Sequence, residues 1–294
     1  MISLVVCSVN EEYLHQLQKN VRETIGVEYE LIFLDNKKEK KGICEVYNLL
    51  AEKARFGIIC FLHEDIIFQG TGWGLKLLEH FRNDPQVGAV GVAGSKYKTA
   101  GCTGWYTGIP EFDCAHILHR YPDRDEWIDL APAGQTDQEV VCLDGVFIAV
   151  RDHIWREARF DENYLKGFHF YDLDLSLRIS REHKCLVVYD IPLIHLTKGG
   201  DFGDCWVEIA LDFHHRFKEL PRCCAVSMPD DTEKRIIITW FNVMKHQSIS
   251  FRNKWKWIST QELWKPIYAY SILKLFLYKP LGLHKIHKKS RRNG

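Results

Sequence analysis

Hydrophobic and polar positions alternate in blocks along the first third of the chain, and each block predicts one strand or helix. Residues 2–9 form a continuous apolar run, typical of a strand buried on both faces. Apolar residues then recur at helical spacing over 14–25, with Asn10 before them as the expected N-cap. The alternation continues with strands expected over 29–34, 57–62 and 87–93, and helices over 43–54 and 73–82.

Strand–helix–strand units in this order favour an α/β fold, with a mixed, mostly parallel sheet flanked by helices. Polar clusters follow three of the strands: Ser8 to Asn10, Asp35 with Asn36, and His63 to Asp65. Ligands of such sheets bind beyond the carboxyl ends of the strands. The three clusters therefore predict a binding site at one edge of the sheet.

The second half of the chain is less regular. Residues 95–140, rich in Gly, Pro, Asp and Trp, are expected to form a functional loop or small insertion. Strands are expected over 142–150 and 185–189, and a helix over 171–183. An apolar helical stripe runs from Trp206 to Leu220, and Pro221 ends it.

The chain is expected to divide into a first domain over 1–220 and a C-terminal helical extension over 221–294. The apolar and aromatic stretch from Trp264 to Leu283 is interrupted by lysines and prolines, and its uncharged runs are too short to span a bilayer. Together with the basic tail at 284–294, it fits either a segment on an anionic membrane surface or a docked helix with a solvated tail.

Charge and cysteine content narrow the classes of function. The 294 residues hold 39 Lys and Arg against 39 Asp and Glu, so no overall basic field favours nucleic acid. Five of the basic residues lie in the tail, which leaves 34 against 39 and a mildly acidic body. Ten cysteines without a CxxC pair argue against zinc, and with a strand-like N-terminus they predict a cytoplasmic protein with reduced thiols.

The order of these features resembles a family 2 glycosyltransferase over about residues 1–200. The resemblance rests on VVCSVN at the first strand, Asp35, the helix VYNLLAEKA, the strand end FLHED, and the segments LDGVFIAVR and YDLDLSLRI. The HED triplet and the YD pair are similar to the subgroup typified by a streptomycin-biosynthesis glycosyltransferase-like protein. The resemblance implies the A-type glycosyltransferase fold, which is a nucleotide-binding α/β domain.

A sugar transferase with a nucleotide-diphosphate donor needs charge stabilisation on its leaving group, and a divalent cation held by carboxylates supplies it. The resemblance places Asp65 at the last acid of the family's DxD motif, with His63 in place of the first acid. It also makes His195 a metal or diphosphate contact. These three residues predict a Mn²⁺ or Mg²⁺ site, and the histidine at position 63 favours Mn²⁺. The alternatives are a solvated strand end and a structural histidine. Glu64 is expected to point away from His63 and Asp65, because side chains alternate along an extended segment.

The acceptor hydroxyl needs a general base, and the resemblance assigns this role to Asp172. Tyr171 stands where the family carries the first acid of this motif. Asp174 lies four residues before Arg178 in a predicted helix, which favours an ion pair. In the competing interpretation, the aspartates are simply carboxylates stabilised at a helix start.

The same resemblance implies donor contacts from several polar residues: Ser8, Asn10, Asp35, Asn48, Asp144 and Gly145. Capping, surface or strand-bulge roles compete for each one. The loop at 198–200 is expected either to lie over the diphosphate or to be an ordinary solvated loop. Aromatic residues of the insertion, Trp105, Tyr106 and Trp127, with His116, are expected to shape an acceptor site or to be packing residues.

The sequence therefore predicts an inverting, metal-dependent, hexosyltransferase-type enzyme that acts on a nucleotide-diphosphate sugar. The expected acceptor is a sugar or glycolipid, with a place in cell-surface polysaccharide or glycolipid synthesis at the inner face of the membrane. A catalytically inactive binding protein of the same fold is the alternative, motivated by His63 and Tyr171. A nucleotidyltransferase is disfavoured, because no Gly-rich, Lys-bearing loop follows the first strand.

Overall fold

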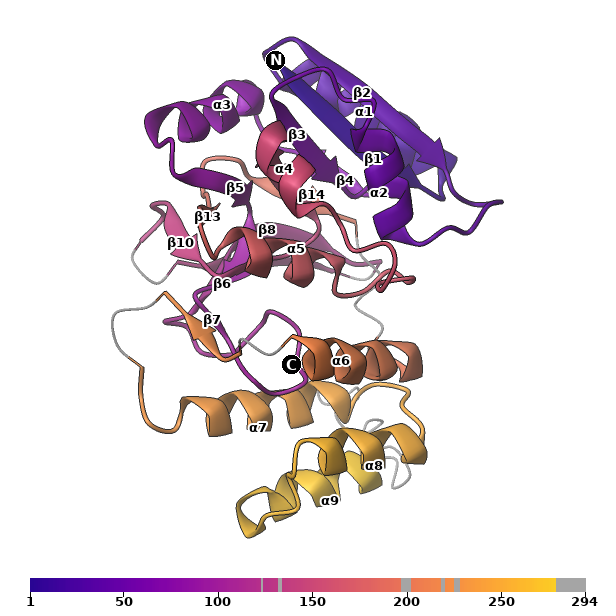
Figure 1. Cartoon of the computed structure of the whole chain (residues 1–294), viewed down its shortest axis with the longest axis vertical. Coiled ribbons are helices and arrows are strands. Elements are labelled where there is room, and N and C mark those ends of the chain that lie inside the picture. The colour runs from indigo at the N-terminus through magenta and orange to yellow at the C-terminus, as the bar shows by residue number, and fades with distance from the viewer. Residues whose placement is uncertain (123, 132–133, 197–201, 218–219, 225–227, 279–294) are drawn as a thin grey trace.

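The computed structural model describes residues 1–122, 124–131, 134–196, 202–217, 220–224 and 228–278. Two large sheets occupy one part of the molecule, and a group of helices forms the opposite end (Figure 1). The predicted loop at 198–200 and the basic tail at 284–294 lie outside the described residues.

The central sheet contains strands from both halves of the described chain. In spatial order its seven strands are β10 (Gln138–Val140), β13 (Lys184–Val187), β5 (Val87–Gly91), β12 (Phe147–Arg151), β3 (Ile58–Leu62), β1 (Ile2–Ser8) and β2 (Tyr29–Asp35). Strands β10 and β12 are antiparallel to their neighbours, and the other five share one direction. The predicted mixed, mostly parallel sheet is confirmed.

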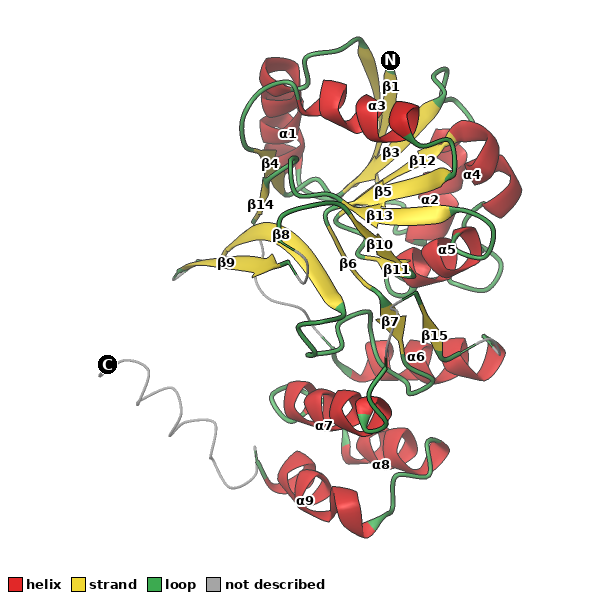
Figure 2. Cartoon of the chain, turned by 90° about the vertical axis from the view of Figure 1, so that its left-hand side faces the viewer, coloured by secondary structure: helices red, strands yellow, loops and turns green. Residues whose placement is uncertain are grey.

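Helices cover both faces of this sheet (Figure 2). One face carries α1 (Glu11–Thr24) and α3 (Trp73–Asn83), and the other carries α2 (Ile43–Ala51), α4 (Asp152–Ala158) and α5 (Tyr171–Ile179). Alternate side chains of β1 point to opposite layers. Leu4 and Val6 belong to one buried cluster with Leu17 of α1, whereas Val5 belongs to the other with Val46 of α2. Burial on both faces explains why this strand is apolar throughout.

A second sheet is formed by strands that follow those of the central sheet along the chain. Its strands are β11 (Cys142–Leu143), β6 (Ala93–Ser95), β8 (Asp113–Arg120), β14 (Leu193–His195) and β4 (Ile66–Phe68), with β9 (Asp125–Leu130) paired to β8. The chain leaves the central sheet for the second sheet after β3, β5, β10 and β13. The carboxyl ends of β3 and β13 therefore lead into strands of the second sheet.

Two expectations about the middle of the chain are wrong. Residues 95–140 are not irregular, because they hold β7 (Tyr97–Lys98), the β8–β9 hairpin and β10. Strand β9, with the sequence DEWIDL, is largely exposed, so it shows no burial period. The strand expected over 142–150 is two strands, β11 and β12, because the chain changes sheets at Asp144 and Gly145.

The helical end contains α6 (Asp204–Arg216), α7 (Thr232–Met244), α8 (Phe251–Thr260), the 3-10 helix η1 (Pro266–Tyr268) and α9 (Ala269–Leu277). It is tied to the rest of the chain by β15 (Arg222–Cys223), which pairs with β7. The Glu233 carboxylate of α7 also accepts hydrogen bonds from the hydroxyls of Tyr97 and Thr99. The ring of Trp206 stacks on Trp240, with 5.1 Å between centroids, which joins α6 to α7. The domain division at residue 220 stays a prediction.

Within the described part of the chain, no helix combines the length and apolar character needed to cross a bilayer.

His80 of α3 links two loops near β10 and β13. Its Nδ1 lies 2.8 Å from the carboxylate of Asp137, and its Nε2 lies 3.0 Å from that of Asp190. Partial burial disfavours the charged imidazole, but the two carboxylates outweigh it and raise the pKa of His80 to about 9.

This arrangement predicts a pH-dependent contribution of His80 to stability. Because the pKa is higher in the folded chain than in the unfolded chain, the stabilisation is complete below pH ~6.5 and is lost as the pH rises through about 9. The difference in the free energy of unfolding between the natural chain and His80→Gln, measured by urea titration, should therefore shrink across this range. A difference that stays constant with pH would contradict the assignment.

Candidate active site

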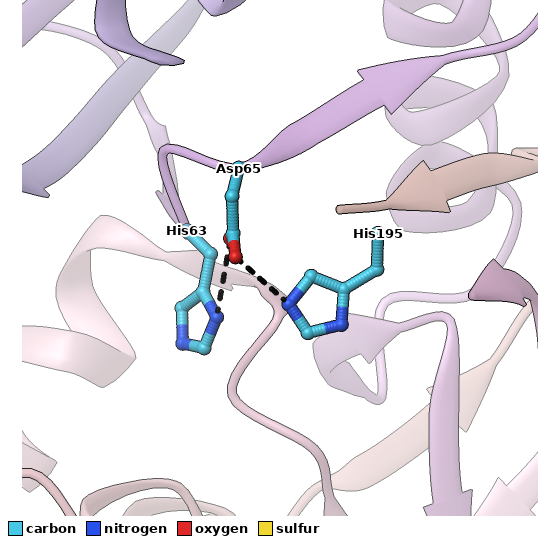
Figure 3. A group of neighbouring side chains, drawn as sticks. All are labelled: His63, Asp65 and His195. Carbon is cyan, nitrogen blue, oxygen red and sulfur yellow. Dashed lines mark ion pairs between the residues drawn. The ribbon is translucent and has the colours of Figure 1, made fainter. Parts of the chain in front are cut away.

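The turn between β3 and β4 supplies three consecutive polar side chains with different partners. The carboxylate of Glu64 accepts hydrogen bonds from the Ser8 hydroxyl at 2.5 Å and from the backbone N–H groups of Val9 and Asn10 at 3.1 Å. Glu64 thus stabilises the turn between β1 and α1 by hydrogen bonding. His63 and Asp65 instead meet His195, which lies at the end of β14 (Figure 3).

His63, Asp65 and His195 form a cluster with one ligand atom each, and these atoms lie within 4.8 Å of one another. Asp65 stands between the two imidazoles: its carboxylate is 3.9 Å from Nδ1 of His63 and 3.4 Å from Nε2 of His195. All three side chains are half-buried. The cluster forms because β14 pairs antiparallel with β4, and this register sets His195 opposite Ile66, directly after Asp65.

The ionisation of the cluster suits a cation. Burial alone would raise the pKa of Asp65, but the neighbouring His195 and His63 hold it below its usual value. Burial, and then the nearby His195, lower the pKa of His63. At neutral pH the cluster therefore presents a carboxylate and a neutral imidazole, which are the forms that bind metal.

The two departures from the family pattern, His63 and Tyr171, contact each other. Nε2 of His63 lies 2.9 Å from the Tyr171 hydroxyl, which itself donates to the backbone carbonyl of Gly145 at 3.2 Å. Because the hydroxyl proton is used on Gly145, its oxygen accepts from Nε2–H of His63. This network assigns the lone pair to Nδ1, the nitrogen that faces Asp65.

Asp172 follows Tyr171 and lies in the same region. Its carboxylate accepts backbone N–H bonds from Gly145 at 3.0 Å and Leu173 at 2.9 Å. Burial, and then the charge of Asp144, raise the pKa of Asp172 to about 7 despite these bonds. Asp144 is held by Trp105, whose indole N–H donates to it at 2.6 Å.

The start of α5 sets the position of Tyr171 and Asp172. Phe170 precedes the helix with a φ of 68°, a left-handed conformation that costs a bulky residue about 1–3 kcal/mol. Its ring packs against Trp206 and Phe213 of α6, at centroid distances of 5.4 and 5.1 Å. Packing from the helical end of the molecule therefore holds the strained residue beside the site.

Gly145 is required by its neighbour Tyr171, since a Cβ at this position would lie 2.1 Å from the Tyr171 hydroxyl oxygen. The ion pair predicted between Asp174 and Arg178 is present, with 2.5 Å between Nη2 of Arg178 and the Asp174 carboxylate.

The predicted donor contacts fall into two groups. Ser8 and Asp35 end adjacent parallel strands and stand opposite each other in the register of β1 and β2. Asn10 follows Ser8, and its side chain caps α1 by accepting from the N–H of Glu12 at 3.0 Å. Asn48 is buried in α2, and its amide bonds to the backbone of Phe160. The structure thus brings Ser8, Asn10 and Asp35 to one edge and places Asn48 within a packed helix contact.

Two residues near the cluster have no counterpart in the sequence-based predictions. His119 of β8 pairs in register with His195, with 5.3 Å between ring centroids. Phe168 is an exposed aromatic residue whose ring centroid lies 5.6 Å from that of His63. Neither carries a sequence signal, because His119 lies in a stretch without visible period and Phe168 in a loop.

The residues predicted to shape an acceptor site form two pairs of ring contacts. Trp127 of β9 is exposed and stacks on His116 of β8, with 5.4 Å between ring centroids. Trp105 contacts Tyr106 edge-on at 5.9 Å, and its indole reaches Asp144 as described. Trp105 therefore connects the insertion to the acidic part of the site.

Comparisons with known proteins agree with this architecture. The profile of a glycosyltransferase-like family matches residues 3–215. Residues 1–349 of S. aureus TarS align with a TM-score of 0.51 at 10% identity, over 88% of this chain and 78% of that chain. The complex of the same TarS fragment with UDP gives a TM-score of 0.50 at 12% identity, over the same shares.

Other solved structures align with lower scores. The mannosyltransferase PcManGT from Pyrobaculum calidifontis, solved with GDP-Man and Mn²⁺, has a TM-score of 0.48 at 11% identity over 94% of this chain and 84% of that chain. GalNAc-T7, solved with UDP, GalNAc and Mn²⁺, has a TM-score of 0.47 at 12% identity over 67% of this chain. The chain spans 44% of that structure's length. Among curated protein sequences, no significant match is found.

The resemblance to the streptomycin-biosynthesis subgroup stays a prediction. The family profile covers 213 of the 294 residues, from 3 to 215, which is more than half of the chain. The chain therefore belongs to the glycosyltransferase-like family, and its fold is the A-type glycosyltransferase fold.

Proposed function

We propose that this protein transfers a sugar from a nucleotide-diphosphate donor to a hydroxyl acceptor, with inversion at the anomeric carbon. The observation that carries the proposal is the convergence of Asp172 with the His63–Asp65–His195 cluster. Tyr171 joins them, since it bonds to His63 and directly precedes Asp172 in α5. A base for the acceptor and a charge centre for the leaving group are thus neighbours.

The cluster suits a divalent cation that accepts nitrogen ligands. Two imidazoles and one carboxylate fit Mn²⁺ better than Mg²⁺, which prefers an all-oxygen shell and keeps its waters. Three protein ligands also leave coordination positions open for diphosphate oxygens. When bound, such a cation stabilises negative charge that develops on the nucleoside diphosphate.

The donor nucleotide is assigned to the edge formed by the ends of β1 and β2. Ser8, Asn10 and Asp35 lie there, and the Asp35 carboxylate is an acceptor for a base or ribose proton. We give Asn48 a supporting role, because its amide is engaged with Phe160, and we place Asp144 and Gly145 below the donor sugar. The UDP complex of TarS shares this fold, so UDP is the first nucleotide to test.

Asp172 is proposed as the general base. A base works best when its pKa lies near the working pH, and the raised pKa of Asp172, about 7, meets this condition. A single base and a single leaving group imply one in-line displacement, hence inversion. The exposed rings of Phe168 and Trp127 offer faces on which a sugar acceptor can stack. We further propose that the transferred sugar is a hexose and that the acceptor is a sugar or glycolipid of cell-surface synthesis.

The alternative is a binding protein of the same fold without catalysis. It draws on the replacement of two expected acids by His63 and Tyr171. The two proposals differ on whether any nucleotide-sugar turns over.

The first prediction concerns the base. Asp172→Asn should lower sugar transfer by about 10²-fold or more, because the amide cannot accept the acceptor proton. UDP affinity, measured by calorimetry, should stay unchanged. In the natural chain, kcat/KM should fall about tenfold for each pH unit below 7, since only the ionised carboxylate acts.

The matched control is Asp212→Asn, which changes an exposed aspartate of α6. Full turnover by Asp172→Asn would refute the base, and absence of turnover by the natural chain with UDP-, GDP- and dTDP-sugars would favour the binding protein.

The second prediction concerns the cation. Mn²⁺ should bind the full chain more tightly than Mg²⁺, and His195→Gln should weaken Mn²⁺ binding by about tenfold or more, because one of three ligands is lost. Electron paramagnetic resonance of free Mn²⁺ measures this without any activity assay. His153→Gln, an exposed histidine of α4, serves as the control. Equal Mn²⁺ binding by His195→Gln and His153→Gln would show that the cluster is not the cation site.

The third prediction isolates the Tyr171 hydroxyl. Tyr171→Phe keeps the ring that packs on Tyr47 but leaves Nε2 of His63 without its partner. Partners that orient metal ligands change affinity by about 10–100-fold, so Mn²⁺ binding should weaken within this range. Loss of the two hydrogen bonds of this hydroxyl, to His63 and Gly145, should cost about 1–3 kcal/mol of stability.

Tyr189→Phe removes a hydroxyl that bonds to the backbone of Leu130 and should leave Mn²⁺ affinity unchanged. A Tyr171→Phe chain with the Mn²⁺ affinity of the natural protein would show that the hydroxyl does not orient His63.

A further inference from the structure

Helices α8 and α9 form one end of the molecule (Figures 1 and 2), and they and the segment between them expose several large apolar side chains. We call this set the aromatic surface and define it by six exposed residues: Phe251, Trp255, Trp264, Tyr270, Leu273 and Leu277. Ring contacts connect it across both helices. Phe251 and Trp255 are 6.4 Å apart, Trp255 and Trp264 are 4.5 Å apart, and Phe251 lies 4.9 Å from Phe276 of α9.

The exposed positions of α9 follow the helical period. Leu273 and Leu277 are four residues apart and therefore lie on one face, with Tyr270 one turn before them. Leu275 and Tyr278 point inward and are buried. Helix α9 is thus apolar on its inner face and also on much of its outer face, and large contiguous patches of this kind mark interaction sites.

The charge of the sequence is strongly divided, and its C-terminal part carries the positive share. Residues 245–294 hold twelve of the 39 Lys and Arg but only one of the 39 acids, Glu262. The preceding residues therefore keep 27 basic against 38 acidic side chains, a balance of −11 opposite +11. Arg252, Lys256 and Lys265 belong to the same described segment as the aromatic surface.

We infer that the aromatic surface is an interfacial docking site for an anionic lipid membrane. Trp and Tyr favour the boundary between headgroups and acyl chains, since their rings are apolar and their N–H and O–H groups reach water. Flanking Lys and Arg interact with anionic headgroups while their stems cover apolar surface. Helix α9, at nine residues, is short and lies on such a surface rather than across it.

The charge division favours a membrane over a second copy of this chain as occupant. A closed symmetric dimer through this surface would bring two basic segments together, and like charges across an interface oppose association. An anionic bilayer offers negative charge and an apolar interior at the same place. The inference goes beyond the proposed sugar transfer, and it is tested without any nucleotide.

The test compares two variants that place the same charge on equally exposed leucines. Leu273→Glu changes the aromatic surface at a residue 56% exposed, and Leu75→Glu changes α3 at a residue 52% exposed. Full-length proteins are sedimented with vesicles that contain anionic phosphatidylglycerol and with vesicles of phosphatidylcholine alone. The natural chain should bind the anionic vesicles more tightly, and rising salt should weaken this binding.

Leu273→Glu should lower affinity for the anionic vesicles by about tenfold or more, because it adds a repelled charge and removes an inserted side chain. Leu75→Glu should bind like the natural chain, and circular dichroism should show both variants folded. Equal binding by the two variants, or no binding by the natural chain, would overturn the inference. It would also be overturned if, without lipid, the natural chain sediments as a dimer and Leu273→Glu as a monomer, because the occupant would then be a second copy.

Discussion

Three consecutive side chains at the turn between β3 and β4 hold separate parts of the chain in one place. His63 reaches Tyr171 of α5, Glu64 reaches the turn after β1, and Asp65 reaches His195 of β14. The constraint behind them is that the chain leaves one sheet at Leu62 and enters another at Ile66. Polar residues in such a short passage face neighbours on several sides. A single turn therefore contacts the end of β1, the end of β14 and the start of α5, which carry the proposed donor edge, cation site and base.

The helical end contributes to the site although it lies far along the chain. Phe170 adopts its left-handed conformation against rings of α6, and α6 is in turn stacked on α7 through Trp206 and Trp240. Tyr171 and Asp172 begin α5 directly after this residue. The two departures from the family pattern, His63 and Tyr171, form one hydrogen-bonded pair. Because this pair is neutral, it adds no negative charge to a region that already contains Asp65, Asp144 and Asp172.

The inner strands β1, β3 and β5 could be predicted from the sequence because they are buried on both faces and are almost continuously apolar. The grouping of His63, Asp65 and His195 was also predicted, although only from the family resemblance. Strand β9 had no signal because an exposed edge strand shows no burial period, and the break at Asp144 was hidden because β11 and β12 are both apolar. The partner of His63 could not be predicted, since no local pattern tells which distant side chain meets an imidazole.

The central claim is that nucleotide and cation share one site anchored by Asp65. Its most direct test is calorimetric titration of UDP into the full chain with and without Mn²⁺, repeated for Asp65→Asn. If the ligands meet, Mn²⁺ tightens UDP binding, UDP tightens Mn²⁺ binding by the same factor, and this coupling disappears in Asp65→Asn. If UDP bound the natural chain equally well with and without Mn²⁺, or if the coupling survived in Asp65→Asn, the account would be contradicted.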